Sequence, residues 1–287
     1  MSDKPTPAPG AFFAIPGWSV IRLEGADASR FAQAQFMGDV EALAPGHWQW
    51  NGWLTPKGRL VALFALLRLQ PDHLLLLLAD ADPGAFVADL SRYVFRSKVR
   101  IVHESGLAVQ GRFAAPAIAT AAAFAGTLSP TGLELDFGGD GGPRTLAVSA
   151  TQAAEDPAAS ARWRALDLAH GLPRLDASQA SQWTPQQLSL DRLRAYSVKK
   201  GCYPGQEIVA RTHFLGQAKR GLLRLRAEVA IPVGPVGAAA DPERAVGTIV
   251  STADGEALAV MPLDASGPWL VGDVECTSLP VLGGLAR

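Results

Sequence analysis

The sequence predicts an α+β protein that ends in a small all-β module. Strand and helix patterns alternate along the first two thirds of the chain, and short alternating strands with frequent Gly and Pro fill the last third. In addition, 48% of the 287 residues are hydrophobic. A chain of this size and composition can bury substantial cores, so we expect roughly two or three domains.

A strand followed by a helix opens the first block. The stretch "WSVIRLEG" alternates polar and apolar residues as a strand does. The next stretch, "ADASRFAQAQF", indicates a helix from a cap at Asp27 to an end near Gly38. We interpret the first ten residues, which are rich in Pro and small side chains, as a flexible lead-in.

An apolar hairpin is the next expected element, over residues 60–79. The run is interrupted by Arg68 and by a polar turn at residues 70–73. Neither half approaches the roughly 18 apolar residues that a membrane helix needs, so we expect no membrane partner. Asp82 followed by Pro83 then predicts the start of a helix.

A second α+β block follows, and then the all-β module. We expect strands at "KVRIVHE", "LAVQGRF", "GLELDFG" and "RTLAVSA", with an Ala-rich helix near residues 115–125. A further helix, "ASARWRALDLAHGLP", is stopped by Gly171 and Pro173. From a boundary near Gly216 onward, short strands and a "TADGE" turn predict the C-terminal module.

Composition excludes several classes of protein. A net charge of -1 with 18% charged residues does not indicate a nucleic-acid coat protein or a protein that adheres to anionic lipid. The first residues lack the basic start and continuous apolar run of a secretory signal. The two cysteines, Cys202 and Cys276, have no metal-ligand spacing, and a bridge between them is not favoured. We expect a cytoplasmic protein without a metal site.

The stretch "KKGCYPGQE" places Cys202 between a lysine pair and an expected helix. A cysteine reacts as the thiolate, which Lys199, Lys200, Arg211 and a helix N-terminus would stabilise. Glu207 is four residues before Arg211, so we expect the two to pair along the helix.

The two glycines of this stretch, Gly201 and Gly205, permit unusual dihedral angles or a close approach of another backbone. No partner base is evident, because His213 lies about two helical turns beyond the cysteine. A buried, inert Cys202 is therefore the competing interpretation.

The stretch "KKGCYPGQEIVAR" resembles the signature of the YgfZ family, Lys-Gly-Cys-Tyr-x-Gly-Gln-Glu, at every fixed position: Lys200, Gly201, Cys202, Tyr203, Gly205, Gln206 and Glu207. Distant stretches also resemble the family, namely "FAQAQFMGDV", "PKGRL", "WRALDLAHGLPRLD" and "GTIVS". Ala34 and the pair Met37-Gly38 depart from residues that are common in relatives.

The resemblance implies a fold similar to the T-protein of glycine cleavage, a tetrahydrofolate-dependent aminomethyltransferase. Three domains would surround a central channel: residues 1–50 with 151–215, residues 51–150, and a β-barrel of residues 216–287. The cofactor implied is tetrahydrofolate or a derivative, in contact with Trp18 and Trp163.

The resemblance also implies partners. These are iron-sulfur enzymes or assembly proteins, as for the mitochondrial relative that assembles iron-sulfur proteins, with an effect on tRNA thiomethylation through one such enzyme. Cys202 would be the functional thiol. A single thiolate cannot hold a cluster alone, because clusters usually take four ligands.

Two functions are compared, an aminomethyltransferase and a folate-binding accessory protein. The transferase uses a buried acid on the strand after its Gly-containing turn, but "GRLVALFALL" contains none. Asp39 is the nearest other acid, at a position suited to turn or cap chemistry. We therefore favour the accessory role over an enzyme.

Aromatic and basic groups leave alternatives open. Indole faces offer offset stacking to a flat pterin, but Trp18 and Trp163 would serve equally as core residues. Trp48, Trp50 and Trp53 line the same channel or fill a junction between blocks. The region 190–226 is basic, with Tyr196 and Tyr203 interleaved. It would bind the glutamate tail of folate, tRNA or a protein partner, or would only be solvated. Its cations are Arg192, Arg194, Lys199, Lys200, Arg211, Lys219, Arg220, Arg224 and Arg226.

Overall fold

A computed structural model describes residues 10–128, 132–216 and 218–287. The expected lead-in lies outside these residues, apart from Gly10. The first sheet has the order β3 (His47–Leu54), β4 (Leu60–Gln70), β5 (His73–Ala79), β2 (Trp18–Glu24) and β6 (Arg100–His103), and all neighbours are antiparallel. The second has the order β1 (Phe13–Ala14), β7 (Ala108–Arg112), β10 (Thr145–Ser149), β9 (Gly132–Asp136) and β8 (Ala125–Thr127).

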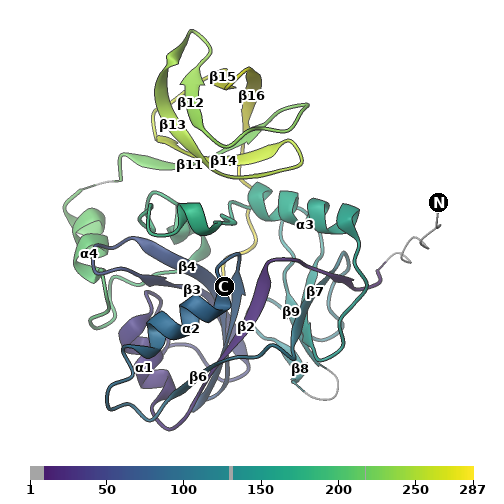
Figure 1. The fold of residues 1–287 in the computed structure, drawn as a ribbon, viewed down its shortest axis with the longest axis vertical. Helices are drawn as coiled ribbons and strands as arrows, with labels where there is room; N and C mark the ends of the chain where they lie inside the picture. The colour runs from purple at the N-terminus through teal and green to yellow at the C-terminus, as the bar shows by residue number, and fades with distance from the viewer. Residues whose placement is uncertain (1–9, 129–131, 217) are drawn as a thin grey trace.

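The remaining strands close into a barrel, because the last strand pairs with the first. Around the barrel the order is β11 (Arg220–Arg226), β14 (Glu256–Pro262), β13 (Asp241–Ala253), β12 (Pro235–Ala238), β15 (Trp269–Val271) and β16 (Val274–Leu279). Figure 1 shows the barrel at one end of the molecule, with helix α3 (Pro157–Ala169) beneath it and above the second sheet. The predicted α+β class with a C-terminal barrel is confirmed.

The other helices are α1 (Ala28–Gln35), α2 (Pro83–Ser91) and α4 (Gln206–Phe214), with short 3₁₀ turns η1 (Ala177–Gln179) and η2 (Leu190–Leu193). Asp82 caps α2 as predicted, since its carboxylate accepts a hydrogen bond from Ala85 N at 2.6 Å. Asp27 precedes α1, but its carboxylate accepts from Lys98 N at 2.8 Å instead. None of the helices in the described ranges combines the length and apolar character that a membrane crossing requires.

The leucine run of β5 is explained by burial on both faces of the first sheet. Leu74, Leu76 and Leu78 belong to a core that α1 and α2 cover. Leu75 and Leu77 point the other way, into the core at the meeting point of the sheets. Since successive side chains of a strand alternate between faces, a strand covered on both sides has no polar alternation.

The same alternation divides the tryptophans of β3 between two cores. Trp48 and Trp50 join the central core, where each lies within 6.0 Å of the Phe137 ring. Trp53 lies in the core on the helix-covered face and contacts Phe86. The three indoles therefore form no single cluster, and Trp48 and Trp50 fill the junction between sheets.

The prediction of an Ala-rich helix near residues 115–125 is wrong, because this segment forms no helix. The backbone there pairs with the start of β3: Trp48 N donates to Ala122 O at 2.8 Å, and Phe124 N donates to Gly46 O at 3.1 Å. The segment ends in β8. Because a helix of this length is marginal alone, these tertiary hydrogen bonds override its composition.

The expected boundary between residues 50 and 51 does not separate two sheets. It falls inside β3, which pairs along its length with β4. Strands β2 and β4 share that sheet, so residues 18–103 form one sheet together with α1 and α2 on one of its faces. The division of the chain into domains otherwise stays a prediction.

The segment after the barrel returns to the centre of the molecule, where the last residue lies (Figure 1). Leu282 N donates to Ala169 O at 2.8 Å, and Leu285 O accepts from Trp50 Nε1 at 2.8 Å. The Arg287 guanidinium lies 5.3 Å from the Trp48 ring centroid. This segment therefore ties the barrel to the central core.

Candidate functional site

The signature stretch begins with a buried lysine that fastens it to helix α1. Lys200 is 7% exposed, and its ammonium donates hydrogen bonds to Gln33 O at 2.5 Å, Phe36 O at 2.6 Å and Gly38 O at 3.0 Å. These carbonyls lie at the helix end, where backbone acceptors lack helical partners. Burial lowers the pKa of Lys200 to about 8. Its charge is engaged by α1, so Lys200 serves as a structural tie.

Tyr203 anchors the other side of the cysteine. Its hydroxyl donates to Ser197 O at 3.0 Å, and its buried ring lies 5.0 Å from Lys200 Nζ. Burial raises the pKa of the Tyr203 hydroxyl, with Tyr196 contributing, so it stays a neutral donor. The Gln206 side chain donates to Lys200 O at 3.2 Å, which closes the loop around the cysteine.

Gly205 joins the signature to the Lys-Gly-Arg turn. It has φ +79°, and a Cβ placed there would lie 2.6 Å from Gly58 Cα and 2.6 Å from Thr55 O. Gly58, at φ +68°, is equally enclosed by Ile208. Glycine is thus required by conformation and by close approach at Gly205. Gly201 has open space around it and no positive φ, so the expected need for glycine there is not met.

Cys202 is exposed at the tip of this fixed loop, just before α4. The expectation of a buried Cys202 is therefore wrong, and its reactivity stays a prediction, while Cys276 is buried in the barrel core. Both cysteines are free. The expected Glu207 to Arg211 ion pair is absent from the ion pairs of the described residues, and both side chains are exposed.

The two predicted tryptophans come together on Phe137. Trp163 stacks on that ring at 5.7 Å and 17°, and Trp18 meets it edge-on at 6.1 Å. Trp163 is fully buried, with the Arg144 guanidinium 4.6 Å from its ring. Neither indole N–H has a hydrogen-bond partner among the described residues. Buried polar groups of this kind normally find a partner.

A cavity of about 500 Å³ opens beside Trp18. Its walls come from residues 14–18, residues 105–109 and the stretch after β10, including Gln152 and Glu155. The volume is within the range of small-molecule pockets, about 300 to 1,000 Å³. Trp163 and Cys202 do not belong to its walls. The structure therefore brings the tryptophans together but not at the cysteine.

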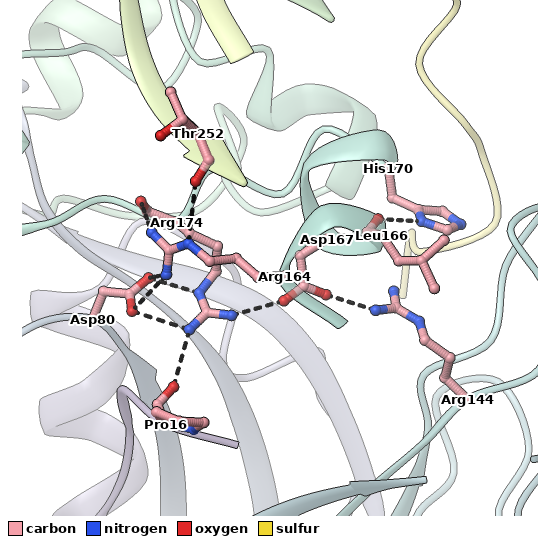
Figure 2. A network of polar contacts seen from close by, with 9 residues as sticks. All are labelled: Pro16, Asp80, Arg144, Arg164, Leu166, Asp167, His170, Arg174 and Thr252. Atoms are coloured by element: carbon pink, nitrogen blue, oxygen red, sulfur yellow. Dashed lines mark hydrogen bonds and ion pairs between the residues drawn. The ribbon is translucent and has the colours of Figure 1, made fainter. Parts of the chain in front are cut away.

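A buried ion network crosses this centre, and sequence reasoning missed it (Figure 2). Asp167 on α3 accepts from Arg144 at 2.7 Å and from Arg174 at 2.8 Å. Arg174 also forms a two-point contact with Asp80, at 2.6 and 3.0 Å. Arg164 completes it by donating to Asp80 at 3.2 Å and to Thr252 O of the barrel at 3.5 Å.

The network links all three sheets, because Asp80 follows β5, Arg144 precedes β10 and Thr252 belongs to β13. Burial acts to lower the pKa of Arg174, but Asp167 and Asp80 outweigh it and raise that pKa. For Arg144 burial prevails, and its pKa is lowered. The available sequence signal was the charge of Asp80, Asp167 and Arg174 beside apolar segments.

The basic region 190–226 does not form one surface. Lys200 is held by α1, and Arg224 is buried against Glu256 with two contacts of 2.8 Å. Arg192 donates to His170 O and Leu282 O. Tyr203 is buried as well. Asp39, the other singled-out acid, accepts from Ala42 N at 3.3 Å, in keeping with turn chemistry.

Comparison with known proteins gives the class and then the family. A scan against protein-family models finds no match. Glycine cleavage system aminomethyltransferase T from Bartonella henselae superposes with a TM-score of 0.70, over 96% of this chain and 85% of that chain, at 14% identity. The chain is therefore a protein with the aminomethyltransferase T fold.

Sequence relatives carry the name tRNA-modifying protein YgfZ. The protein from Vibrio vulnificus (strain CMCP6) is 30% identical over 228 residues, covering 74% of this chain and 68% of that protein. The protein from Edwardsiella ictaluri (strain 93-146) is 29% identical over 228 residues, covering 73% and 69%. The chain belongs to the YgfZ family.

Proposed function

We propose that this protein binds tetrahydrofolate or a derivative and serves as an accessory protein in tRNA modification, in keeping with the name of its relatives. The observation that carries the proposal is the cavity of about 500 Å³ at Trp18. Trp18 supplies an apolar face and an N–H without a partner among the described residues. Gln152 and Glu155 supply polar groups at the wall. This combination fits a flat, polar pterin.

Trp163 has a different place in the proposal. Its ring is enclosed by Phe13, Phe113, Phe137 and Arg144. Direct contact with a ligand requires one of these neighbours to move. Without such movement, Trp163 supports Phe137, on which Trp18 rests. Loss of Trp163 is then expected to weaken folate binding through the position of Trp18.

Cys202 is the functional thiol of the proposal, acting toward iron-sulfur enzymes or assembly proteins. Its exposure leaves the sulfur accessible to another protein, and the loop that carries it is held by Lys200, Tyr203 and Gly205. Among the described residues, no three His, Cys, Asp or Glu side chains gather as a metal site. A cluster at Cys202 would therefore take its other ligands from a partner.

Aminomethyl transfer is the alternative function. The relevant strand, β4, is formed as expected and contains no carboxylate between Leu60 and Gln70. Two acids of the central ion network, the half-buried Asp80 and the buried Asp167, are both paired with arginines. Each of these carboxylates is already engaged by guanidinium donors, so neither is free to contact a folate nitrogen. These contacts favour the accessory role, and aminomethyl exchange from a lipoylated carrier by the purified protein would contradict it.

Titration calorimetry with tetrahydrofolate tests the ligand. We expect Trp18→Ala to abolish measurable binding and Trp18→Phe to retain part of it, because an aromatic face remains. Trp163→Ala should weaken binding, and circular dichroism would verify that each variant is folded. Unchanged affinity in Trp18→Ala would refute the folate site. For the thiol, Cys202→Ser should abolish complementation of tRNA thiomethylation while leaving folate affinity unchanged, and full complementation would refute the role.

A further inference from the structure

A second cavity of about 500 Å³ lies on the helix-covered face of the first sheet. Its walls include Trp53 and Thr55 at the end of β3 and Arg92 and Tyr93 after α2. A smaller cavity of about 180 Å³ adjoins it and shares Trp53 and Asp89. Neither cavity has a role in the function proposed above.

Trp53 gives this cavity an aromatic wall. The residue is 5% exposed, and its ring meets Phe86 at 5.6 Å and Tyr93 at 5.9 Å, both edge-on. Its indole N–H has no hydrogen-bond partner within the described part of the chain. A buried donor without an acceptor is unfavourable, but this nitrogen is itself inaccessible, so a base in the cavity meets the indole ring and reaches the N–H only after a local movement.

Next to the cavity, residues 92–100, "RYVFRSKVR", contain two exposed aromatic side chains flanked by exposed basic ones. Tyr93 is 45% exposed and Phe95 is 84% exposed. The exposed basic side chains are Arg92, Arg96, Lys98 and Arg100, and the segment contains no acid.

The cations of this segment are weakly held. Arg92 approaches Asp89 at 3.7 Å, and Arg100 approaches Glu24 at 3.6 Å. Exposed pairs of this kind contribute little, about 0 to 1 kcal/mol. The Arg96 guanidinium lies 5.4 Å from the Phe95 ring, an arrangement that also suits stacking on a base.

We propose that this face, Trp53 with residues 92–100, binds single-stranded RNA. Phosphates lie along the basic side chains, and unstacked bases stack on Tyr93 and Phe95 or enter the cavity toward Trp53. Proteins that bind single strands combine a positively charged surface with aromatic platforms in this way. An acidic peptide would use the charges alone. A duplex keeps its bases paired and cannot offer them to the cavity.

The position of the face relates it to the signature loop. Thr55 lines the cavity, and a Cβ at Gly205 would lie 2.6 Å from Thr55 O. Bound RNA would therefore lie one backbone contact away from the loop that carries Cys202. The inference goes beyond the accessory function, which needs no direct RNA contact, and it does not depend on folate binding.

Fluorescence anisotropy with a labelled single-stranded RNA of mixed sequence tests the proposal, over a series of salt concentrations. The triple variant Arg92→Ala, Arg96→Ala, Lys98→Ala should reduce the slope of log affinity against log salt by about 2, since each single-strand phosphate contact contributes about 0.7. Tyr93→Ala should weaken binding roughly 5-fold to 150-fold. The matched control, Lys219→Ala with Arg226→Ala in the other basic region, should bind as the unchanged protein does.

Three results would overturn the proposal. They are an equal loss of affinity in the control variant, equal affinity for duplex RNA of the same length, and displacement of RNA by heparin with no effect of Tyr93→Ala. Since Tyr93 contacts Trp53, Phe95→Ala provides a second aromatic test at a side chain exposed enough not to affect folding. Calorimetry with tetrahydrofolate should be unchanged in the triple variant, so failure of one proposal is distinguishable from failure of the other.

Discussion

Replacing Lys200 with Met tests whether the signature lysine acts as a structural tie. The ammonium of Lys200 bonds three carbonyl oxygens at 2.5 to 3.0 Å around the end of α1. Methionine has a similar length and no donor, so the substitution removes these bonds with little change in packing. The loop that carries Cys202 would lose its side-chain link to the end of α1.

The magnitude follows from two opposing effects. A buried carbonyl left without a donor costs about 1.5 to 2 kcal/mol, so three cost about 5 kcal/mol. Burial of the ammonium destabilises the folded protein by about 3 kcal/mol at neutral pH, because it lowers the pKa of Lys200 from 10.5 to about 8. The substitution removes this destabilisation. We therefore expect Lys200→Met to reduce the free energy of unfolding by about 2 kcal/mol at pH 7.

The effect should depend on pH in a definite direction. Between pH 8 and 10.5 the folded protein binds fewer protons at Lys200 than the unfolded chain does, because the folded pKa is the lower one. Stability from this group therefore rises with pH across that window and is lost as pH falls through 8. The difference between the unchanged protein and Lys200→Met should grow by up to about 3 kcal/mol.

Urea unfolding at several pH values between 7 and 10 measures this difference. Lys199→Met is the matched control, because the Lys199 side chain is exposed, and it should leave stability within about 0.5 kcal/mol. A stability difference that stays constant or shrinks above pH 8 would refute the reasoning. It would mean that the three carbonyls stabilise the ammonium more than burial destabilises it.

Three further predictions concern the elements that hold the site. Asp167→Asn should lower the free energy of unfolding by about 3 to 5 kcal/mol in urea titrations, since two buried arginines lose their shared carboxylate; a loss below about 1 kcal/mol would contradict this. Gly205→Ala should cost more than about 2 kcal/mol through strain and contact with Gly58, whereas Gly201→Ala should cost less than about 0.5 kcal/mol, as thermal unfolding of the pair would measure. Leu285→Ala should cost about 2 to 5 kcal/mol, because Leu285 is buried and its carbonyl accepts from Trp50 Nε1. The unfolding transition followed by tryptophan fluorescence should therefore move to a lower urea concentration.

Much of the fold was readable from local patterns. Alternation predicted β2, the cap at Asp82 predicted α2, and the short strands after Gly216 predicted an all-β module, which the family resemblance specified as a barrel. The Ala-rich segment failed because its backbone finds partners in β3 that no local pattern reveals. Local propensity is decisive only where tertiary hydrogen bonds do not compete with it.

The site was less predictable than the fold. Proximity in sequence suggested that Lys200 would stabilise the Cys202 sulfur, but its side chain donates to carbonyls at and just after the end of α1, more than 160 positions earlier. The ion network depends on Asp80, Asp167 and Arg174 meeting from separate elements. Such pairs form only when sheets pack, because charged groups at the ends of apolar segments are buried together.

The relative position of the Cys202 thiol and the cavity at Trp18 distinguishes an accessory role from transfer of a one-carbon unit to the thiol. Tyr203 of the signature and Val209 of α4 share one core with Trp18 and Trp163, so the loop and the tryptophans are held in a fixed relation. Cys202 is nevertheless exposed and is not part of the cavity wall at Trp18. A thiol in this position is accessible to a second macromolecule rather than to a pterin held at Trp18. Folate would then act on stability or affinity for a partner, and transfer of a one-carbon unit to the thiol would require a ligand that spans the distance between the two sites.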